Sequence, residues 1–325
     1  MDAAPFISVV IPNHNGAATI ALCLEAVLAS AGGVAFEVVV ADDGSRDDSR
    51  AIIGRYPCRL VELPEQRGAS AARNAGAAAA SGEVILFIDA DCIVLPDTVA
   101  MAAAAARRSG PEWIVGGTYT LQPYDRGFFG RFQSAFINHF ETKRLDAPDY
   151  IATHAMVIYA ATLQDAGGFP EKFLPIIEDV EFSHRLRRSG YKLRMDPTIL
   201  VRHLFNYDLR RSLSNAWRKS RYWTIYSLGC RDLLNDSGTA SHELKINVIT
   251  FTLGLLLLLV WLPTGLAVVL AGNLWVQRRL LASFHRAGGW SFALAAGAYY
   301  TLLYPLPVGL GGLTGVLQYY LKGSR

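Results

Sequence analysis

Residues 82–97 read GEVILFIDADCIVLPD, and this stretch carries the fold prediction. The run Val84–Ile88 consists of β-branched, aliphatic and aromatic residues, as in a strand that is covered on both faces. Asp89 and Asp91 follow it with one alanine between them. Carboxylates at the end of a buried strand lose hydration and repel each other, so they need a compensating positive charge. The stretch therefore predicts a cation site at the end of a buried strand.

Strand and helix patterns alternate over the first part of the chain. Strand-like segments are 6–12, 36–45, 58–64 and 83–91, and helix-like segments are 17–30, 46–56 and 68–81. This alternation predicts an α/β fold, a mostly parallel sheet with helices on both faces, whose ligand binds beyond the carboxyl ends of the strands. Three polar clusters would then converge there: Asn13 to Asn15, Asp42 with Asp43, and Asp89 with Asp91.

Each cluster also has a structural explanation. The sequence DDGS suits a turn at a strand exit, so Asp42 and Asp43 are explained equally well as turn residues or as ligands. A single DxD pair occurs by chance in many proteins. The recurrence of acids and amides at successive strand ends is what favours a binding site.

The C-terminal part of the chain differs in composition. Residues 246–276 carry no charge, and neither do residues 290–321. Both runs exceed the roughly 20 residues that cross a hydrocarbon core, so they predict transmembrane helices. The net charge of +3 gives no argument for nucleic acid binding. The N-terminus has no basic segment typical of a signal peptide, and the four cysteines form no CxxC pair, which favours a cytosolic setting.

Two aspects of the membrane region stay open. A single span over 246–271 would put the basic segment after it outside, against the positive-inside tendency, whereas a hairpin that turns near Pro263 has arms too short for a full span. Residues 126–144 and 207–223 combine basic and aromatic residues, which suits either a lipid headgroup layer or core-facing helices with a solvated face.

The motifs, in their order along the chain, resemble glycosyltransferase family 2. The resemblance spans about residues 6–205 and rests on SVVIPNHNGAATI, VVVADDGSRDDS, the segment 67–97, GGF, and EDVEFSHRLRRSGYKLRMDP. It implies a Rossmann-like GT-A fold, an inverting mechanism and a nucleotide-diphosphate sugar donor. The expected domains are a catalytic domain at 1–205, an amphipathic interfacial connector at 206–243, and transmembrane or membrane-associated helices at 244–325.

The resemblance also implies roles for single residues. Asp91 would hold a divalent metal, Mn²⁺ or Mg²⁺, on the donor diphosphate, with Asp89 nearer the ribose. His203 is a candidate third metal ligand or a structural histidine. The nucleotide sugar would also contact Pro12, Asn13, Asn15, Asp42, Asp43 and Arg73, of which Arg73 is otherwise explained as a surface salt bridge.

The Glu178–Asp179 pair opens a predicted helix. In the family the aspartate of this motif is the general base, which takes the acceptor hydroxyl proton as the oxygen attacks the anomeric carbon. Carboxylates are also favoured at a helix N-terminus by its macrodipole, so capping is the alternative. Glu181 is expected to orient the site or to pair with Arg185, and the role of His154 is open.

Departures from the family pattern bear on the reaction. His14 stands where a tyrosine is common, and the QxxRW motif of processive members is absent, which favours transfer of a single sugar. The predicted function is metal-dependent transfer to a lipid or lipid-linked acceptor at the cytosolic face of the inner membrane, by a multi-pass protein. A sugar nucleotidyltransferase and a non-catalytic nucleotide-binding scaffold are the alternatives. A sugar nucleotidyltransferase is expected to have a basic glycine-rich phosphate loop after the first strand, but the segment PNHNGAAT contains no lysine or arginine.

Overall fold

A computed structural model describes residues 6–30 and 32–322, and the chain divides into two compact units. Unit 1 comprises residues 1–125 and 141–205, and unit 2 comprises residues 126–140 and 206–325. The segment 126–140 therefore belongs with the C-terminal helices, although it lies between two parts of unit 1 in the sequence.

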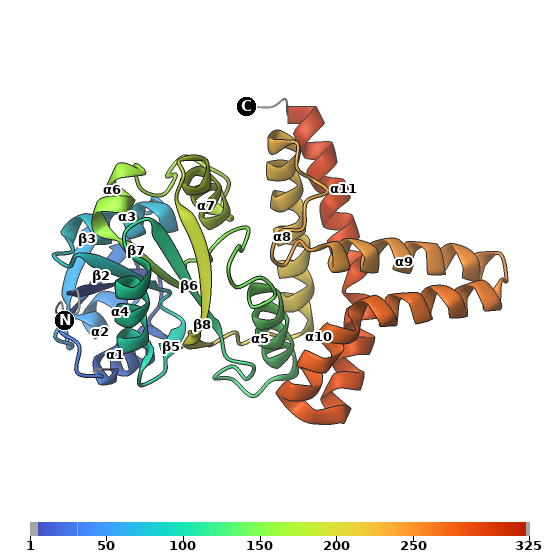
Figure 1. The fold of residues 1–325 in the computed structure, drawn as a ribbon, viewed down its shortest axis with the longest axis horizontal. Helices are drawn as coiled ribbons and strands as arrows, with labels where there is room; N and C mark the ends of the chain where they lie inside the picture. Colours follow the sequence, from blue (N-terminus) through green and yellow to red (C-terminus); the bar gives the residue numbers. More distant parts are fainter. Residues whose placement is uncertain (1–5, 31, 323–325) are drawn as a thin grey trace. The chain divides into compact units, whose positions relative to one another are not determined.

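Unit 1 contains an eight-stranded sheet with the order β3-β2-β1-β4-β7-β6-β8-β5 (Figure 1). The strands are β1 Ile7–Asn13, β2 Phe36–Asp43, β3 Arg59–Leu63, β4 Val84–Ile88, β5 Cys92–Val94, β6 Trp113–Tyr119, β7 Ala155–Tyr159 and β8 Lys192–His203. Strands β1 to β4 pair in parallel, as do β6 and β8, whereas β7 is antiparallel to β4 and β6, and β5 is antiparallel to β8. The predicted α/β fold is confirmed, and the four strands that the sequence pattern identified, β1 to β4, pair in parallel.

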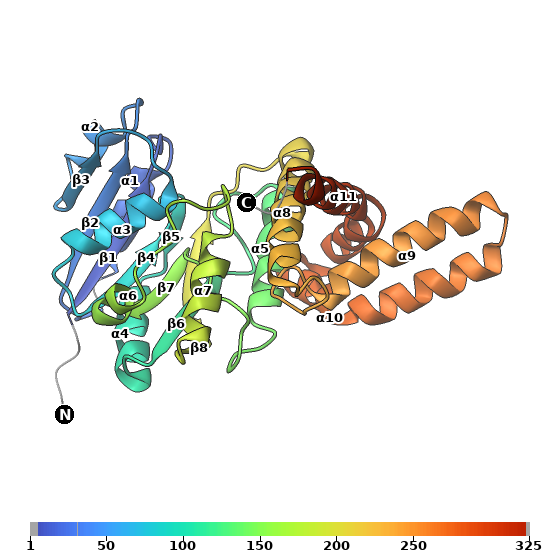
Figure 2. The same cartoon turned by 90° about the horizontal axis from the view of Figure 1, so that it is seen from above.

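Both faces of the sheet are covered. Val9, Val10 and Ile11 follow one another in β1 and all three are fully buried, although successive side chains in a strand point to opposite faces. The helices of unit 1 are α1 Ile20–Ala29, α2 Ser49–Ile53, α3 Ala69–Ala79, α4 Thr98–Ser109, α6 Ala160–Asp165 and α7 Glu178–Arg188 (Figure 2).

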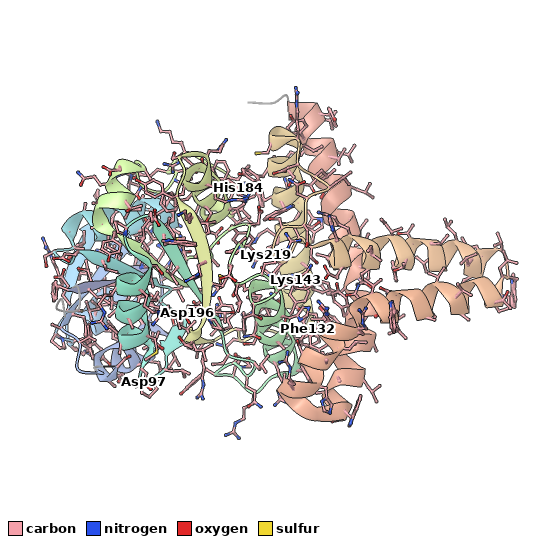
Figure 3. The ribbon with its side chains drawn as sticks, viewed as in Figure 1. Asp97, Phe132, Lys143, His184, Asp196 and Lys219 are labelled. Atoms are coloured by element: carbon pink, nitrogen blue, oxygen red, sulfur yellow. The ribbon has the colours of Figure 1, made fainter. Side chains whose placement is uncertain are left out.

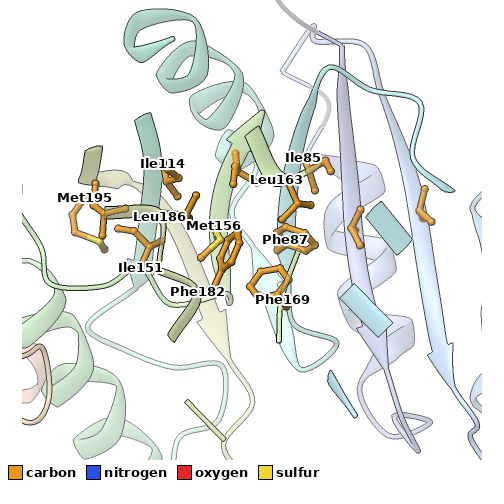
Figure 4. Close-up of a cluster of buried hydrophobic side chains, with 14 residues drawn as sticks. Ile85, Phe87, Ile114, Ile151, Met156, Leu163, Phe169, Phe182, Leu186 and Met195 are labelled. Carbon is orange, nitrogen blue, oxygen red and sulfur yellow. The ribbon is translucent and has the colours of Figure 1, made fainter. Parts of the chain in front are cut away.

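One hydrophobic cluster joins the sheet to α6 and α7. Phe87 of β4 meets the ring of Phe169 edge-on at 5.2 Å, and Phe169 in turn contacts Phe182 of α7 (Figure 4). Helix α3 approaches the sheet closely, because a Cβ at Gly76 would lie only 2.5 Å from Val10 Cγ1. This close approach fixes the position of α3 relative to the strand ends.

Unit 2 is helical. It contains α5 Phe128–Glu141 (without its last residue), α8 Leu209–Cys230, α9 His242–Leu259, α10 Pro263–Ala298, a π-helical turn Tyr299–Leu303 and α11 Pro305–Lys322. Helices α8 and α11 lie side by side, and α9 forms a hairpin with the first part of α10 that projects from them (Figures 1 and 2). The chain turns at residues 260–262. Of the two arrangements that the sequence left open, a single span and a hairpin, the structure therefore has the hairpin.

The phenylalanines of α5 face protein. Phe132, Phe136 and Phe140 are buried, and the Phe132 ring (Figure 3) lies 4.8 Å from Tyr299 and 5.3 Å from Phe284 between ring centroids. The lipid-headgroup interpretation of residues 126–144 is therefore wrong for these side chains. Helical spacing of aromatic residues identifies an apolar face, but it does not tell whether lipid or protein covers that face.

Candidate active site

A tight turn carries the two acids of the DxD motif. β4 ends at Ile88 and β5 begins at Cys92, whose N–H donates a hydrogen bond to the Asp89 carbonyl at 2.9 Å. In the pairing of β5 with β8, Cys92 lies opposite His203. This register brings His203 Nε2 to 3.3 Å from Asp91 Oδ2.

The side chains around Asp91 suit a divalent cation. One ligand atom each from Asp91, Cys92 and His203 lies within 4.8 Å of the others. Cys92 is fully buried, and burial, followed by the nearby Asp91 and Asp89, raises the pKa of its thiol well above its ordinary value, so the thiol is protonated in the metal-free protein. A carboxylate oxygen and an imidazole nitrogen remain, and this donor set fits Mn²⁺ or a similar metal.

The protein compensates the charge of Asp91 only in part. Burial and the neighbouring Asp89 raise the pKa of Asp91 to about 7, although its side chain is 43% exposed. A bound cation would favour the ionised form of this carboxylate. The expectation that two close acids need a positive charge therefore applies to Asp91.

Asp89 is compensated by Arg73. The Arg73 guanidinium donates from Nη2 to Asp89 Oδ1 at 2.9 Å and from Nη1 to Glu178 Oε1 at 2.7 Å. Its side chain is 5% exposed and lies over the ring of Phe169. Burial alone raises the pKa of Asp89, but Arg73 and then His154 outweigh it and hold this pKa below its ordinary value. Arg73 is thus a buried link between two acids, and the surface salt bridge is excluded.

The same contact places the first turn of α7 near the acid turn. Helix α7 begins at Glu178, directly after Ile177, whose backbone is left-handed with φ 68°. Asp179 is half-buried, and its Oδ1 accepts from the Val180 N–H at 2.9 Å. Glu181 pairs with Arg185 at 3.4 Å, which is one of the two roles expected for it from the sequence.

Asp42 is tied into the loop that follows β2. This carboxylate is fully buried and accepts from Asn13 Nδ2 at 2.8 Å, from the Ser45 N–H at 3.0 Å and from Arg50 Nε at 2.7 Å. These hydrogen bonds satisfy the acid within the protein. The turn interpretation of Asp42 is therefore supported by its contacts.

Asp43 holds the loop before α3. Its two oxygens accept from the backbone N–H groups of Arg67 at 2.7 Å and Gly68 at 2.8 Å. Gly68 has φ 97°, a conformation that glycine adopts without steric cost. Asp43 thereby fixes the start of the helix that carries Arg73.

The remaining predicted donor contacts lie at the end of β1. Pro12 pairs in register with Ala41 of β2, and the exposed Asn15 accepts from the Arg46 N–H at 2.9 Å through its side-chain oxygen. Asn15 also has a left-handed backbone with φ 49°. Together with the buried Asn13, these residues form the loop that meets Asp42 at the same sheet edge.

A buried group beside the acid turn includes residues that the sequence analysis missed. His154 stacks on Tyr119 with ring centroids 4.0 Å apart, and its Nε2 lies 3.4 Å from Glu141 Oε2. Glu141 also accepts from Thr118 Oγ1 at 2.7 Å. Burial lowers the pKa of His154, but Glu141, Asp89 and Asp179 together raise it above its ordinary value. No local motif marks Glu141 or Tyr119, because their role arises only where distant segments meet.

The whole chain resembles a solved glycosyltransferase. The mannosyltransferase PcManGT from Pyrobaculum calidifontis, solved with GDP-Man and Mn²⁺, matches over 99% of this chain and 89% of that one, with a TM-score of 0.59 and 19% sequence identity. At this identity the likeness concerns the fold. Unit 1 therefore has the GT-A glycosyltransferase fold, in which the acid turn follows β4 and the Glu178–Asp179 pair opens α7.

Sequence comparison gives the family. Residues 8–164 match the model of glycosyl transferase family 2. Glycosyltransferase AglE of Haloferax volcanii is 27% identical over 205 residues, which are 61% of this chain and 67% of that protein. Succinoglycan biosynthesis protein ExoO of Rhizobium meliloti is 37% identical over 115 residues, which are 34% of this chain and only 33% of that protein. These matches assign residues 8–164 to glycosyltransferase family 2.

Proposed function

We propose that this protein transfers a single sugar, with inversion, from a nucleotide-diphosphate sugar to a lipid or lipid-linked acceptor at the cytosolic face of the inner membrane. The proposed catalytic domain is residues 1–205, followed by the interfacial connector 206–243 and the membrane-associated helices 244–325. The observation that carries the proposal is the Arg73 guanidinium, which holds Asp89 of the DxD turn and Glu178 of the ED helix in one buried cluster.

This link suits a transfer reaction because it brings a cation-binding turn and a helix with proton-accepting carboxylates close together. The DxD turn offers oxygen and nitrogen ligands for a cation and thereby a binding position for a diphosphate. The ED helix brings carboxylates that can take up a proton. A protein that only binds nucleotide has no need for the second group beside the first.

The proposed division of labour follows from the contacts of each acid. In this proposal Asp179 is the general base that removes the proton of the acceptor hydroxyl, whereas the neighbouring Glu178 is paired with Arg73. Glu178 and Arg73 position that base. Asp91 and His203 would hold a divalent metal, with Asp89 beside them, and such a metal supplies positive charge for the departing nucleoside diphosphate.

The donor would extend along the sheet edge toward β1 and β2. Pro12 and Asn15 contribute exposed surface at the end of β1, and the buried Asn13 lies between them and supports that end. The contacts of Asp42 and Asp43 within the protein favour a supporting role, in which they shape the loops on which a nucleotide would rest, alongside any direct contact with the base.

The hydrophobic acceptor is supported by the composition of unit 2. Two helical segments, His242–Leu259 and residues 263–321, are long and have the apolar composition of membrane-associated helices. An anchor of this kind keeps the enzyme beside membrane lipids, where a polyprenyl-phosphate carrier or another lipid acceptor is concentrated.

The test is a panel of nucleotide sugars given to detergent-solubilised full-length protein with membrane lipid extract. Release of nucleoside diphosphate and incorporation of labelled sugar are measured with Mn²⁺, with Mg²⁺ and with chelator. We expect metal-dependent release and label in the lipid fraction. Label that appears only in added water-soluble sugars or peptides would contradict the acceptor, and the absence of any donor turnover would contradict the transfer.

A further inference from the structure

The α9–α10 hairpin exposes an apolar surface on all sides. Only 11% of α9 is buried, and Leu259 and Trp261 near the turn are 76% and 89% exposed. Further exposed apolar side chains along the two arms are Ile249, Leu253, Leu255, Leu256, Leu258, Val268, Leu274 and Trp275. A contiguous apolar surface of this extent is unstable in water and suits hydrocarbon.

The arms are too short to cross a bilayer. The uncharged part of α9, residues 246–259, extends about 21 Å at the helical rise of 1.5 Å per residue. The uncharged start of α10, residues 263–276, has the same length. A hydrocarbon core is about 30 Å thick, so the hairpin would end inside it.

The charges of the hairpin lie at one end. Glu243 and Lys245 stand at the start of α9, and Arg278 and Arg279 follow the uncharged part of α10. The turn itself consists of Val260, Trp261 and Leu262 and has no charged group. A turn that emerged on the far side of the membrane would instead be favoured by polar or charged residues in the opposite headgroup layer.

Buried side-chain amides form hydrogen bonds between the two arms near the charged end of the hairpin. Asn273 Nδ2 donates to Asn247 Oδ1 at 2.9 Å, and Asn247 Nδ2 donates to the Tyr300 carbonyl at 2.7 Å. Gln277 Nε2 donates to the Glu243 carbonyl at 2.8 Å. These bonds hold the two arms together where they leave the rest of unit 2, so the hairpin enters lipid as one body.

Helix α11 is packed closely against α8. A Cβ at Gly311 would lie 2.5 Å from the Trp217 carbonyl oxygen, and one at Gly315 would lie 2.6 Å from that of Arg221. Arg221 Nε also donates to Gln318 at 2.7 Å. Such close backbone approach through small residues is typical of tightly packed helix pairs.

Helix α8 is too basic for hydrocarbon. It carries Arg210, Arg211, Arg218, Lys219 and Arg221 within its first turns. Charged side chains are costly at the bilayer centre but are attracted by anionic headgroups at its surface. On α11 the exposed leucines recur at intervals of four and three residues: Leu306, Leu310, Leu313 and Leu317. The pair therefore offers a basic helix to headgroups and a leucine row to acyl chains.

We infer that unit 2 is a one-sided membrane anchor, in which the α9–α10 hairpin enters and leaves the same leaflet while α8 and α11 lie along the headgroup layer of that leaflet. The partner is an anionic lipid leaflet, and no helix among residues 206–322 reaches the opposite surface. The start of α9, the end of the hairpin and the end of α11 then share one side of the membrane. This arrangement takes the place of the multi-pass topology expected from the sequence, and it does not depend on which acceptor is used.

Cysteine labelling tests the inference in full-length protein. In a Cys58→Ser, Cys230→Ser background, the two remaining cysteines are buried, and single sites are added as Trp261→Cys at the turn, Arg278→Cys at the charged end, or Tyr320→Cys in α11. A membrane-impermeant maleimide is applied to sealed vesicles of both orientations. We expect Arg278→Cys and Tyr320→Cys to react only from the cytosolic side, and Trp261→Cys to react only after detergent. Labelling of Trp261→Cys from either side, or of Tyr320→Cys from the far side, overturns the inference.

A charge at the turn gives a second readout. Trp261→Lys places an ammonium group in hydrocarbon if the hairpin stops within the bilayer, and we expect membrane partitioning to fall about 100-fold. Ser214→Lys on the exposed side of α8 is the matched control and should retain membrane binding. Unchanged partitioning of Trp261→Lys would show that the turn reaches water. Donor turnover is measured on every variant, so failure of the topology and failure of the proposed transfer give separate results.

Discussion

His203 Nε2 at the end of β8 lies 3.3 Å from Asp91 Oδ2 in the turn after β4. The two side chains meet because the short strand β5, which follows the acid turn directly, pairs antiparallel with β8 and sets Cys92 opposite His203. The acid turn is thus anchored at both ends by strands. A metal-binding position on a turn held in this way is pre-organised, which limits the conformational cost of binding.

The first prediction concerns the metal. Asp91→Asn removes the charged oxygen ligand. Loss of a residue that only supports a metal ligand typically lowers metal affinity about 10–100-fold. Because Asp91 would bind the metal directly, we expect the affinity for Mn²⁺ to fall by at least this factor. Isothermal titration of Mn²⁺ with and without donor measures it. Glu112→Gln, which alters an exposed acid of unit 1 paired with Lys192, is the matched control. Unchanged Mn²⁺ affinity in Asp91→Asn would rule out this ligand.

The second prediction concerns the base. Asp179→Asn should leave donor affinity intact and lower turnover by about 10²–10⁴-fold, the usual contribution of general base catalysis. Single-turnover kinetics with labelled donor separate the two quantities. Glu181→Gln, which alters the next acid of the same helix turn and its pair with Arg185, is the control. Near-normal turnover of Asp179→Asn would leave this residue with a structural role at the start of α7.

The third prediction concerns the buried link. Arg73→Met leaves Asp89 and Glu178 without their shared cation, and we expect a loss of about 3 kcal/mol of folding free energy together with weaker donor binding. Arg73→Lys keeps the charge but cannot make both contacts with one planar group, so its effect should be intermediate.

The control for this link is Arg67→Met. Arg67 pairs with Glu171 at the surface, with 52% of the arginine side chain exposed, and surface pairs contribute about 0–1 kcal/mol. Thermal unfolding of the purified protein compares the variants. Equal shifts for the two methionine variants would contradict a special role for Arg73.

The fourth prediction concerns pH. Burial raises the pKa of Asp42, but hydrogen bonds from Ser45 and Arg50 outweigh it and hold the pKa below the ordinary value of 3.8. The folded state therefore keeps Asp42 ionised to lower pH than the unfolded chain does, and the resulting stabilisation is complete above 3.8 and lost as pH falls through the lowered folded pKa. We expect Asp42→Asn to be less stable than the wild type at pH 7, with a gap that narrows below pH 3.8. Thermal unfolding from pH 7 to pH 3 measures this gap, and one that stays constant over the range would contradict the assignment.

Local sequence patterns determined the parallel half of the sheet, the acid-bearing strand ends and the apolar tail. The run Val84–Ile88 identifies a buried strand because burial on both faces selects apolar residues at every position. The position of Asn13, Asp42 and Asp89 at the ends of successive strands likewise predicted that they lie at one edge of the sheet. These features depend on neighbours within a few residues, which is the range that periodicity and turn chemistry report.

Tertiary structure alone decided which distant groups meet. Arg73 bridges Asp89 and Glu178, and His154 pairs with Glu141, through contacts between segments far apart in the chain. The sequence indicated an aromatic face on α5 and uncharged runs near the C-terminus. It did not indicate that Tyr299 covers this face or that α11 packs against α8, because both contacts depend on tertiary packing. Helical periodicity specifies that a face is apolar, whereas the partner that covers it is fixed by the register and close packing of the folded chain.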